Sequence, residues 1–353
     1  MAQINKPTDY FETKLYAGSS SNVTVSGLDF QPDWIWLKNR TNAGNHVVCD
    51  VVRGGNSNGL GNLYPNLTDA EYLPSSTNDS IETINSDGFV VGGNGNTNGS
   101  GENFVSWSWK AGGTGSSNTD GSITSTVSAS TVSGFSIVSY TGTGSNATVG
   151  HGLGAVPKMI IVKDRSAIKN WTVYHVGVGN DKDILLDVTN AANSSTAWNS
   201  TTPSSSVFSI GTLGNVNTSS HNYIAYCFAE KKGFSKFGSY TGNGQSEDGP
   251  FIYTGFKPAF VIVKKYDSTG GNWVMWDNKR SDVPNANVND QVLYPNEPNA
   301  ELSSATREID TLSNGFKIRG EGGNINADAD NFIYMAFAEN PFVTSGGIPT
   351  TAR

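Results

Sequence analysis

The chain has 353 residues and a net charge of −8, with 36% apolar residues, 15% charged residues and 41 glycines. The charged fraction is well below the about 25% of an average globular protein, and glycine exceeds the usual ~7%. An acidic chain lacks the basic surface of duplex-binding proteins, and its longest apolar runs are far shorter than the ~20 residues of a membrane helix. The composition instead favours short strands joined by turn-rich loops.

Targeting signals and cysteine patterns narrow the classes further. Residues 1–14 contain no apolar stretch of the kind found in a secretory signal, so we expect a protein that is made in the cytoplasm. The two cysteines, Cys49 and Cys227, lie far apart and form neither a disulfide scaffold nor a CxxC metal pair. We therefore expect no cofactor and no metal site.

Four kinds of segment recur three times along the chain. An opening segment runs from an aromatic residue to a Tyr, a small residue and Gly; a second encloses an apolar run between a Pro and a Lys six positions later. A third begins with Asn and an aromatic residue or His, and a closing segment begins with Asn and continues as an apolar run. In this order the segments lie at 11–18, 135–142 and 234–242; at 32–38, 157–163 and 258–264; at 45–46, 170–171 and 272–273; and at 103–109, 222–228 and 331–337.

These repeats divide the chain into units of about 100 residues. The expected organisation is a first unit with a short N-terminal arm, a Gly/Ser/Thr-rich linker, a second unit, a third unit and a C-terminal tail. The corresponding ranges are 1–111, 112–133, 134–232, 233–342 and 343–353. The linker has almost no charge, which is typical of a flexible or extended connection.

Each unit is predicted to be a β-sandwich. The runs 34–37, 159–162 and 260–263 are continuous, apolar and rich in β-branched and aromatic residues, as in strands that are buried on both faces. Asn-Gly and Gly-Asn turn signals separate the short predicted strands. We expect an all-β fold of three tandem pseudo-repeated sandwiches of the jelly-roll or lectin-like kind. The units could stack linearly or close around a pseudo-threefold axis.

Two charged pairs recur between the first and third units. Asp50 and Arg53 match Asp277 and Arg280 in spacing and context, whereas the second unit has His175 at the Asp position and lacks the Arg. Recurrence inside one chain indicates that both units need the pair in the same place. A structural salt bridge or a ligand-binding site explains that need, and these four residues are candidate ligand-binding residues.

The remaining candidates concern sugars. Trp198 lies outside the predicted strands and is the tryptophan most suited to an exposed, sugar-stacking position, with packing over a loop as the alternative. Asp50 with Glu71, or Asp277 with Glu301, could supply the two carboxylates of a glycan hydrolase. Solvated loop carboxylates are the ordinary interpretation, and the four histidines lie in no recognised catalytic pattern. We therefore predict no catalytic residue and no enzyme activity.

Five segments of the chain carry a resemblance to a known group of proteins. They are YTGNG at 240–244, GFKPAFVIVK at 255–264, IYMAFAENPF at 333–342, YTGTG at 140–144 and HGLGAVP at 151–157. Together they resemble repeats in structural proteins of tailed phages, especially marine ones, over residues 9–342. Those proteins are commonly labelled tail-fibre or lectin-like virion components. The resemblance implies a virion protein and transfers no catalytic residue.

The expected function is a non-enzymatic phage virion structural protein on the particle exterior, as a tail fibre, spike or tail-associated adhesion component. A capsid decoration or cement protein is the alternative, and a carbohydrate-binding lectin or glycan hydrolase is the second alternative. Expected partners are other virion proteins, further copies of the chain (a trimer is one option) and a host surface glycan. Nucleic acid is not expected, because binding it relies on phosphate neutralisation, and neither is membrane insertion. The tail 343–353 is a candidate arm between subunits.

Overall fold

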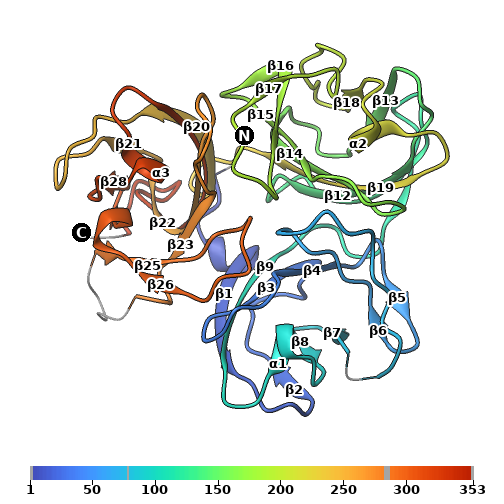
Figure 1. Ribbon diagram of the computed structural model, residues 1–353, viewed down its shortest axis with the longest axis horizontal. Helices are drawn as coiled ribbons and strands as arrows, with labels where there is room; N and C mark the ends of the chain where they lie inside the picture. Colours follow the sequence, from blue (N-terminus) through green and yellow to red (C-terminus); the bar gives the residue numbers. More distant parts are fainter. Residues whose placement is uncertain (1–2, 78, 282–286, 351–353) are drawn as a thin grey trace.

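The structure, a computed structural model that describes residues 3–77, 79–281 and 287–350, consists of antiparallel sheets gathered into three lobes around a common centre (Figure 1). This confirms the predicted all-β fold class. Each lobe contains a main sheet in which the opening strand, the closing strand, the Pro–Lys strand and the third strand lie side by side in that order. A second sheet covers the outer face of each main sheet.

Lobe 1 follows the N-terminal turn η1 (Pro7–Asp9). Its main sheet is ordered β1 (Phe11–Ala17), β9 (Asn103–Trp109), β3 (Trp34–Asn39) and β4 (Val47–Asp50). Its outer sheet is ordered β2 (Val23–Val25), β8 (Gly88–Val91) and β7 (Ile81–Asn85). A short hairpin of β5 (Gly55–Asn56) and β6 (Gly59–Leu60) lies between β4 and β7 in sequence.

Lobe 2 has the largest sheet among the described residues. Its eight strands are β10 (Ser116–Asn118), β11 (Ser125–Ser130), β12 (Phe135–Thr141), β19 (Asn222–Ala229), β14 (Pro157–Asp164), β15 (Thr172–His175), β16 (Gly179–Leu185) and β17 (Asn193–Ser194), in that order. The outer pair is β13 (Ala147–Gly150) and β18 (Val207–Ile210).

Lobe 3 has a main sheet and an outer sheet of equal strand number. The main sheet is ordered β20 (Ser235–Thr241), β29 (Asn331–Pro341), β22 (Phe256–Lys265) and β23 (Val274–Asp277). The outer sheet is ordered β21 (Phe251–Tyr253), β28 (Gly315–Ile318), β27 (Ile309–Leu312) and β24 (Val288–Asn289). A pair of β25 (Gln291–Val292) and β26 (Leu302–Ser303) and the turn η2 (Ala305–Arg307) complete the lobe.

The segment 112–133 differs from its predicted role as a linker. It forms β10 and β11, which extend the sheet of lobe 2 beyond β12. Val127 pairs with Val138 and is buried, and Ile123 joins the same core. Small polar residues alternate with these apolar ones, so one face of β11 can be buried despite the linker-like composition.

Alternation along the main strands gives each lobe two packed faces. In β3, Ile35 and Leu37 point into the core of lobe 1, while Trp34 and Trp36 point into a core that all three lobes share. The corresponding strands β14 and β22 divide their side chains in the same way. The prediction that these runs are buried on both faces is therefore confirmed.

Three one-turn helices precede the closing strands: α1 (Gly95–Asn98), α2 (Gly214–Asn217) and α3 (Gly323–Asn326). The last Asn of each helix is buried, and its side-chain oxygen accepts a backbone N–H from the loop after the opening strand. The donors are Ser19 to Asn98 (2.8 Å), Thr143 to Asn217 (2.7 Å) and Asn243 to Asn326 (3.0 Å). Each bond fixes one end of its lobe.

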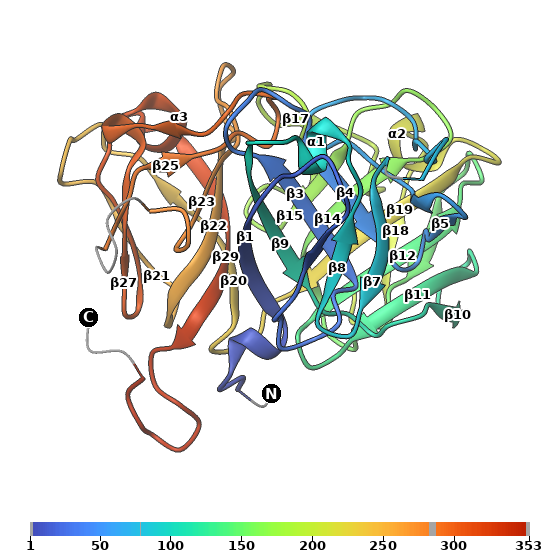
Figure 2. The same cartoon turned by 90° about the horizontal axis from the view of Figure 1, so that it is seen from below.

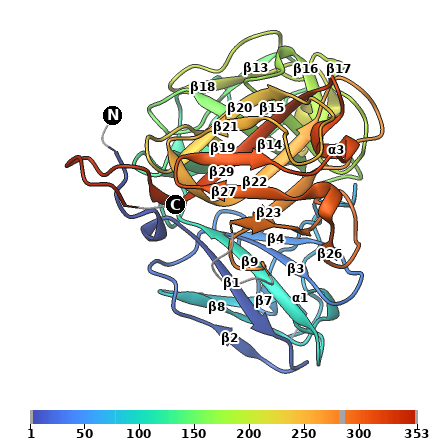
Figure 3. The ribbon, with the colours of Figure 1, turned by 90° about the vertical axis from the view of Figure 1, so that its left-hand side faces the viewer.

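The segment after β29 leaves the body beside the N-terminal segment (Figures 2 and 3). Its backbone N–H at Ser345 donates to the Asn5 side-chain oxygen (2.9 Å), and the Asn5 amide donates to the Ser345 hydroxyl (2.8 Å). In the described part of the tail, these bonds join the two ends of one chain. Residues 351–353 of the predicted inter-subunit arm lie outside the described residues.

The shared core predicts that the three lobes unfold together. Phe337 of β29 lies 5.3 Å from Phe11, 6.0 Å from Phe228 and 6.4 Å from Phe260, measured between ring centroids, and so touches all three lobes. Phe337→Ala should lower the free energy of unfolding by about 3–5 kcal/mol and leave a single transition in scanning calorimetry. The control Leu73→Ala alters a half-exposed side chain and should change the free energy of unfolding by less than about 0.5 kcal/mol. Separate transitions for the lobes would contradict the shared core.

Candidate functional site

The predicted pair Asp50 and Arg53 lies in the turn that ends β4. One oxygen of the Asp50 carboxylate accepts the backbone N–H groups of Val52 (3.0 Å) and Arg53 (2.8 Å), and the other accepts Nε of Arg53. The remaining guanidinium nitrogens donate to the carbonyl of Val48 (2.9 Å) and to Oε1 of Glu71 (2.8 Å). Both side chains of the pair are fully buried.

This pair continues into lobe 2. The Tyr226 hydroxyl on β19 donates to Asp50 Oδ2 over 2.7 Å, and Arg165 contacts Glu71 over 2.7 Å. Two residues of lobe 2 therefore complete a network that begins in lobe 1. We call this contact, with Tyr226, Asp50, Arg53, Glu71 and Arg165 at its centre, the 1–2 seam. Every charge in it faces an opposite charge or a hydrogen-bond donor, which a buried ion pair requires.

The second predicted pair forms the equivalent network between lobes 3 and 1. Nε1 of Trp107 on β9 donates to Asp277 Oδ2 (2.9 Å), and Arg280 Nε donates to the same oxygen (2.6 Å). Glu301 then bridges Arg280 (2.7 Å) and Arg40 (2.6 Å). This contact is the 1–3 seam.

The contact between lobes 2 and 3, the 2–3 seam, is built from neutral groups. His175 occupies the Asp position, and its Nε2 lies 3.1 Å from the carbonyl oxygen of Tyr334 on β29. The Gly177 N–H donates to Nδ1 (3.0 Å), so Nε2 carries the proton. The closing strand has Met335 where Trp107 and Tyr226 stand in the other lobes. Because methionine donates no hydrogen bond, a buried carboxylate here would lose its partner.

Two of three buried lysines join neighbouring lobes, although none of the three emerged as a candidate from the sequence. Lys38 donates to the carbonyl of Pro298 (3.1 Å) and Lys163 to that of Thr68 (2.9 Å), in each case across a seam, and Lys264 donates to Gly271 in its own lobe. Burial lowers the pKa of Lys38 and Lys163 to about 8 and that of Lys264 to about 7. The sequence does contain a signal for these lysines. In all three units a lysine ends the apolar run, six positions after the proline that precedes it.

These positions correct the sequence-based site. The two members of each pair, Asp50–Arg53 and Asp277–Arg280, contact each other, but the two pairs lie in different seams. Both pairs are buried, so neither is open to a ligand. The glycan-hydrolase candidates also change, because an arginine separates Asp50 from Glu71 and Asp277 from Glu301. Buried ion-pair networks at the 1–2 and 1–3 seams therefore replace the predicted ligand-binding set.

Trp198 is likewise buried rather than exposed, with 1% of its surface accessible. Its ring packs edge-on against Tyr174 at 5.7 Å between centroids, within the core of lobe 2. A loop tryptophan next to a sandwich core gains more from covering that core than from remaining in water. It therefore offers no surface for sugar stacking.

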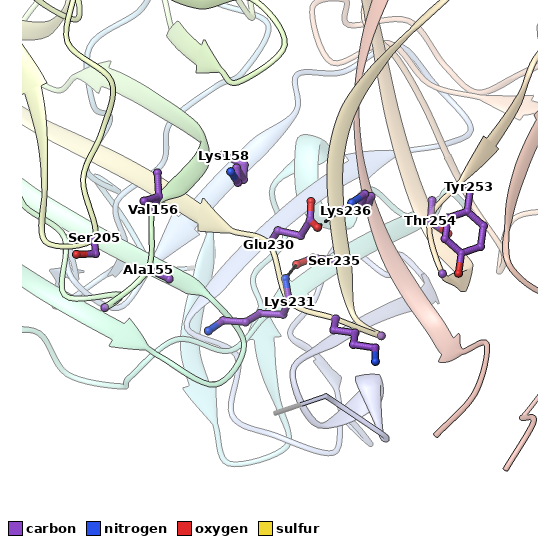
Figure 4. A pocket seen from close by; sticks show the side chains of 14 residues that line it. Ala155, Val156, Lys158, Ser205, Glu230, Lys231, Ser235, Lys236, Tyr253 and Thr254 are labelled. Atoms are coloured by element: carbon purple, nitrogen blue, oxygen red, sulfur yellow. Dashed lines mark hydrogen bonds and ion pairs between the residues drawn. The ribbon is translucent and has the colours of Figure 1, made fainter. Parts of the chain in front are cut away.

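A cleft of about 780 Å³ lies open between lobes 2 and 3 (Figure 4), and another hollow of about 670 Å³ lies on lobe 2 itself. Val156 and Lys158 border it on lobe 2, and Lys236 and Tyr253 border it on lobe 3. Lys231 and Lys232, in the connection from β19 to β20, line its floor together with Glu230. A corresponding hollow between lobes 1 and 3 holds only about 50 Å³.

Metal sites and membrane spans each need a particular arrangement of side chains. Within residues 3–77, 79–281 and 287–350, no three His, Cys, Asp or Glu side chains are grouped so as to hold a metal ion. Over the same ranges, no helix has the length and apolar character needed to cross a membrane. The two cysteines are buried and unpaired.

A family model described as "Domain of unknown function (DUF7483)" matches residues 6–341. The chain belongs to the DUF7483 family. No curated protein matches this DUF7483 chain. The solved structure titled "Crystal Structure of the STIV MCP" aligns with 93% of this chain and 95% of its own, at 8% identity and a TM-score of 0.19. The family assignment therefore rests on the sequence match.

Removing an arginine from a seam should be costly. Arg53→Met leaves the buried Asp50 and the adjacent Glu71 without their shared cation, so the free energy of unfolding should fall by about 3–5 kcal/mol in urea denaturation. Arg280→Met should have the same effect at the 1–3 seam. The control Lys317→Met breaks a pair whose Asp248 is largely exposed and should cost less than about 1 kcal/mol. An unchanged midpoint for Arg53→Met would show that the network stabilises nothing.

The 2–3 seam predicts a loss of stability in acid. Burial lowers the pKa of His175 from 6.5 to about 4. Between these values the unfolded chain binds a proton that the folded protein does not, so the free energy of unfolding falls as pH decreases from 6.5 to 4. His175→Gln removes the titrating ring but keeps an amide donor, and should reduce this slope by up to about 1.4 kcal/mol per pH unit. Equal slopes for the two proteins, measured by urea denaturation at several pH values, would argue against the assignment.

Proposed function

We propose that this DUF7483 protein is a non-enzymatic structural protein of a phage virion, displayed on the particle exterior as a tail-associated adhesion component. The observation that carries the proposal is the closed arrangement of three sandwiches around one shared core (Figure 1). Two of its seams are fixed by buried ion-pair networks and the third by neutral hydrogen bonding. These contacts join the lobes without a disulfide bond, since both cysteines are buried and unpaired.

The use of charged groups supports a structural role. The carboxylates that were catalytic candidates in the sequence form ion pairs in the seams, where each contacts an arginine. Three of the eight tryptophans, Trp107, Trp171 and Trp273, donate hydrogen bonds from one lobe to another. These residues therefore hold the lobes in register, which is the task of a structural subunit.

The cleft between lobes 2 and 3 favours adhesion over a purely structural position. It is larger than the hollow between lobes 1 and 3 and has both cationic and aromatic groups at its edge. A decoration protein needs surfaces that fit a capsid lattice, whereas an adhesion component needs a site for a ligand. The resemblance to tail-fibre repeats agrees with the second requirement. We expect the protein to act as a homo-oligomer together with other virion proteins.

Electron cryo-microscopy of the purified particle tests this proposal. We expect density for the three-lobed body on the tail, and antibodies against the chain should reduce particle adsorption to host cells. Isotype antibodies of unrelated specificity provide the control. Density covering the capsid lattice would support a decoration protein and reject the adhesion role. Absence of the chain from the particle, checked by mass spectrometry, would reject the virion assignment altogether.

A further inference from the structure

We propose that the cleft between lobes 2 and 3 binds an acidic saccharide, one that carries sulfate or carboxylate groups. The proposal deepens the adhesion function above, on which it rests, by naming its ligand class. It starts from the way lobes 2 and 3 meet. The 2–3 seam lacks the arginine networks of the other seams within the described residues, and at its outer edge the two lobes leave about 780 Å³ open. Ligand sites typically occupy about 300–1,000 Å³, enough for a few sugar rings.

The charge of the cleft is opposite to that of the whole protein. Four lysines line it with one glutamate, although the chain as a whole carries −8. Glu230 is already bound to Lys236 over 2.8 Å. Lys158 and Lys232 make no ion pair with any carboxylate in the described part of the chain. A concave site of one charge sign concentrates ligands of the opposite charge, so the cleft selects anions.

The other lining groups distinguish a saccharide from a simple anion. Tyr253 on β21 is 59% exposed and stands on the lobe 3 side of the cleft, where Figure 4 shows it opposite Val156. A tyrosine ring combines an apolar face with a polar tip, and therefore suits the C–H face and hydroxyl groups of a sugar. Val156 is 38% exposed and adds apolar contact on the other side. A small inorganic anion would use neither residue.

The shape of the cleft suits a chain of sugars. A second hollow of about 250 Å³ continues from it, with Lys232, Gly233, Tyr253 and Gly255 common to both. The groove therefore passes Tyr253 and reaches Val343, the first residue of the tail. Long acidic polymers such as duplex nucleic acid would extend beyond this local cationic patch onto a protein of net negative charge. A short stretch of acidic polysaccharide matches the patch better.

Calorimetric titration of the purified full-length chain tests the proposal with four probes. These are a sulfated dextran oligosaccharide, an oligogalacturonate of equal length, a neutral dextran oligosaccharide and inorganic sulfate. At least one acidic oligosaccharide should bind at least about tenfold more tightly than the neutral one, and its affinity should fall as salt is raised. The two acidic probes distinguish sulfate from carboxylate recognition. Equal affinity for the neutral and acidic oligosaccharides would overturn the proposal. Binding of inorganic sulfate as tightly as the acidic oligosaccharides would overturn it too.

Matched variants locate the site. Lys158→Ala with Lys232→Ala should weaken binding at least about tenfold, and Tyr253→Ala should weaken it several-fold. Lys169→Ala with Lys279→Ala removes the same charge outside the cleft and should change affinity less than about twofold. An equal loss in both double variants would indicate non-specific attraction and reject the site. Unchanged thermal unfolding of each variant confirms that it is folded.

These titrations are independent of where the protein sits on the particle. If the protein is located on the tail but does not bind acidic saccharides, the proposed function stands and the proposed ligand is rejected. If it binds them but is absent from the particle, the virion role is rejected and the binding site stands. Acidic oligosaccharide binding that survives the Lys158 and Lys232 changes would place the ligand elsewhere and reject the cleft.

Discussion

The architecture depends on one recurrent contact, in which the strand end of one lobe meets the closing strand of the next. At two seams this contact contains a buried aspartate that receives a hydrogen bond from the neighbouring lobe, from Tyr226 or Trp107. A buried carboxylate is costly unless its oxygens are fully bonded. Here the arginine three residues later and the backbone of the turn supply those bonds locally. The cross-lobe donor then fixes the register between lobes more than it adds stability.

The third seam shows how the contact changes when one partner changes. Met335 cannot donate a hydrogen bond, and the facing position holds the neutral ring of His175 instead of an aspartate. The backbone carbonyl of Tyr334 becomes the acceptor, so the lobes still meet. Without an arginine network among the described residues, however, the two lobes are joined by fewer polar bonds at this seam. The open cleft lies along the edge of this same seam.

The shared core explains why the lobes form one body. Each main sheet buries both of its faces, one against its own outer sheet and one against the other lobes. Large aromatic rings, with Phe337 among the central ones, fill the space where the three inner faces converge. A lobe removed from the others would expose this entire face to water. The apolar area involved makes such separation unfavourable.

Local patterns in the sequence were enough to predict the fold class and the strands that are buried on both faces, because apolar runs and turn chemistry are short-range properties. The repeats also identified the Asp50–Arg53 and Asp277–Arg280 pairs as residues that two units need, since the comparison lies within one chain. What those pairs contact was not predictable, because Tyr226 and Trp107 lie 176 and 170 positions away from the aspartates they bond. The segment 112–133 was mistaken for a linker because Ser and Thr conceal the alternation of β11. The burial of Trp198 and the cleft between lobes 2 and 3 follow from tertiary packing alone, because exposure and cavities depend on how separate sheets meet.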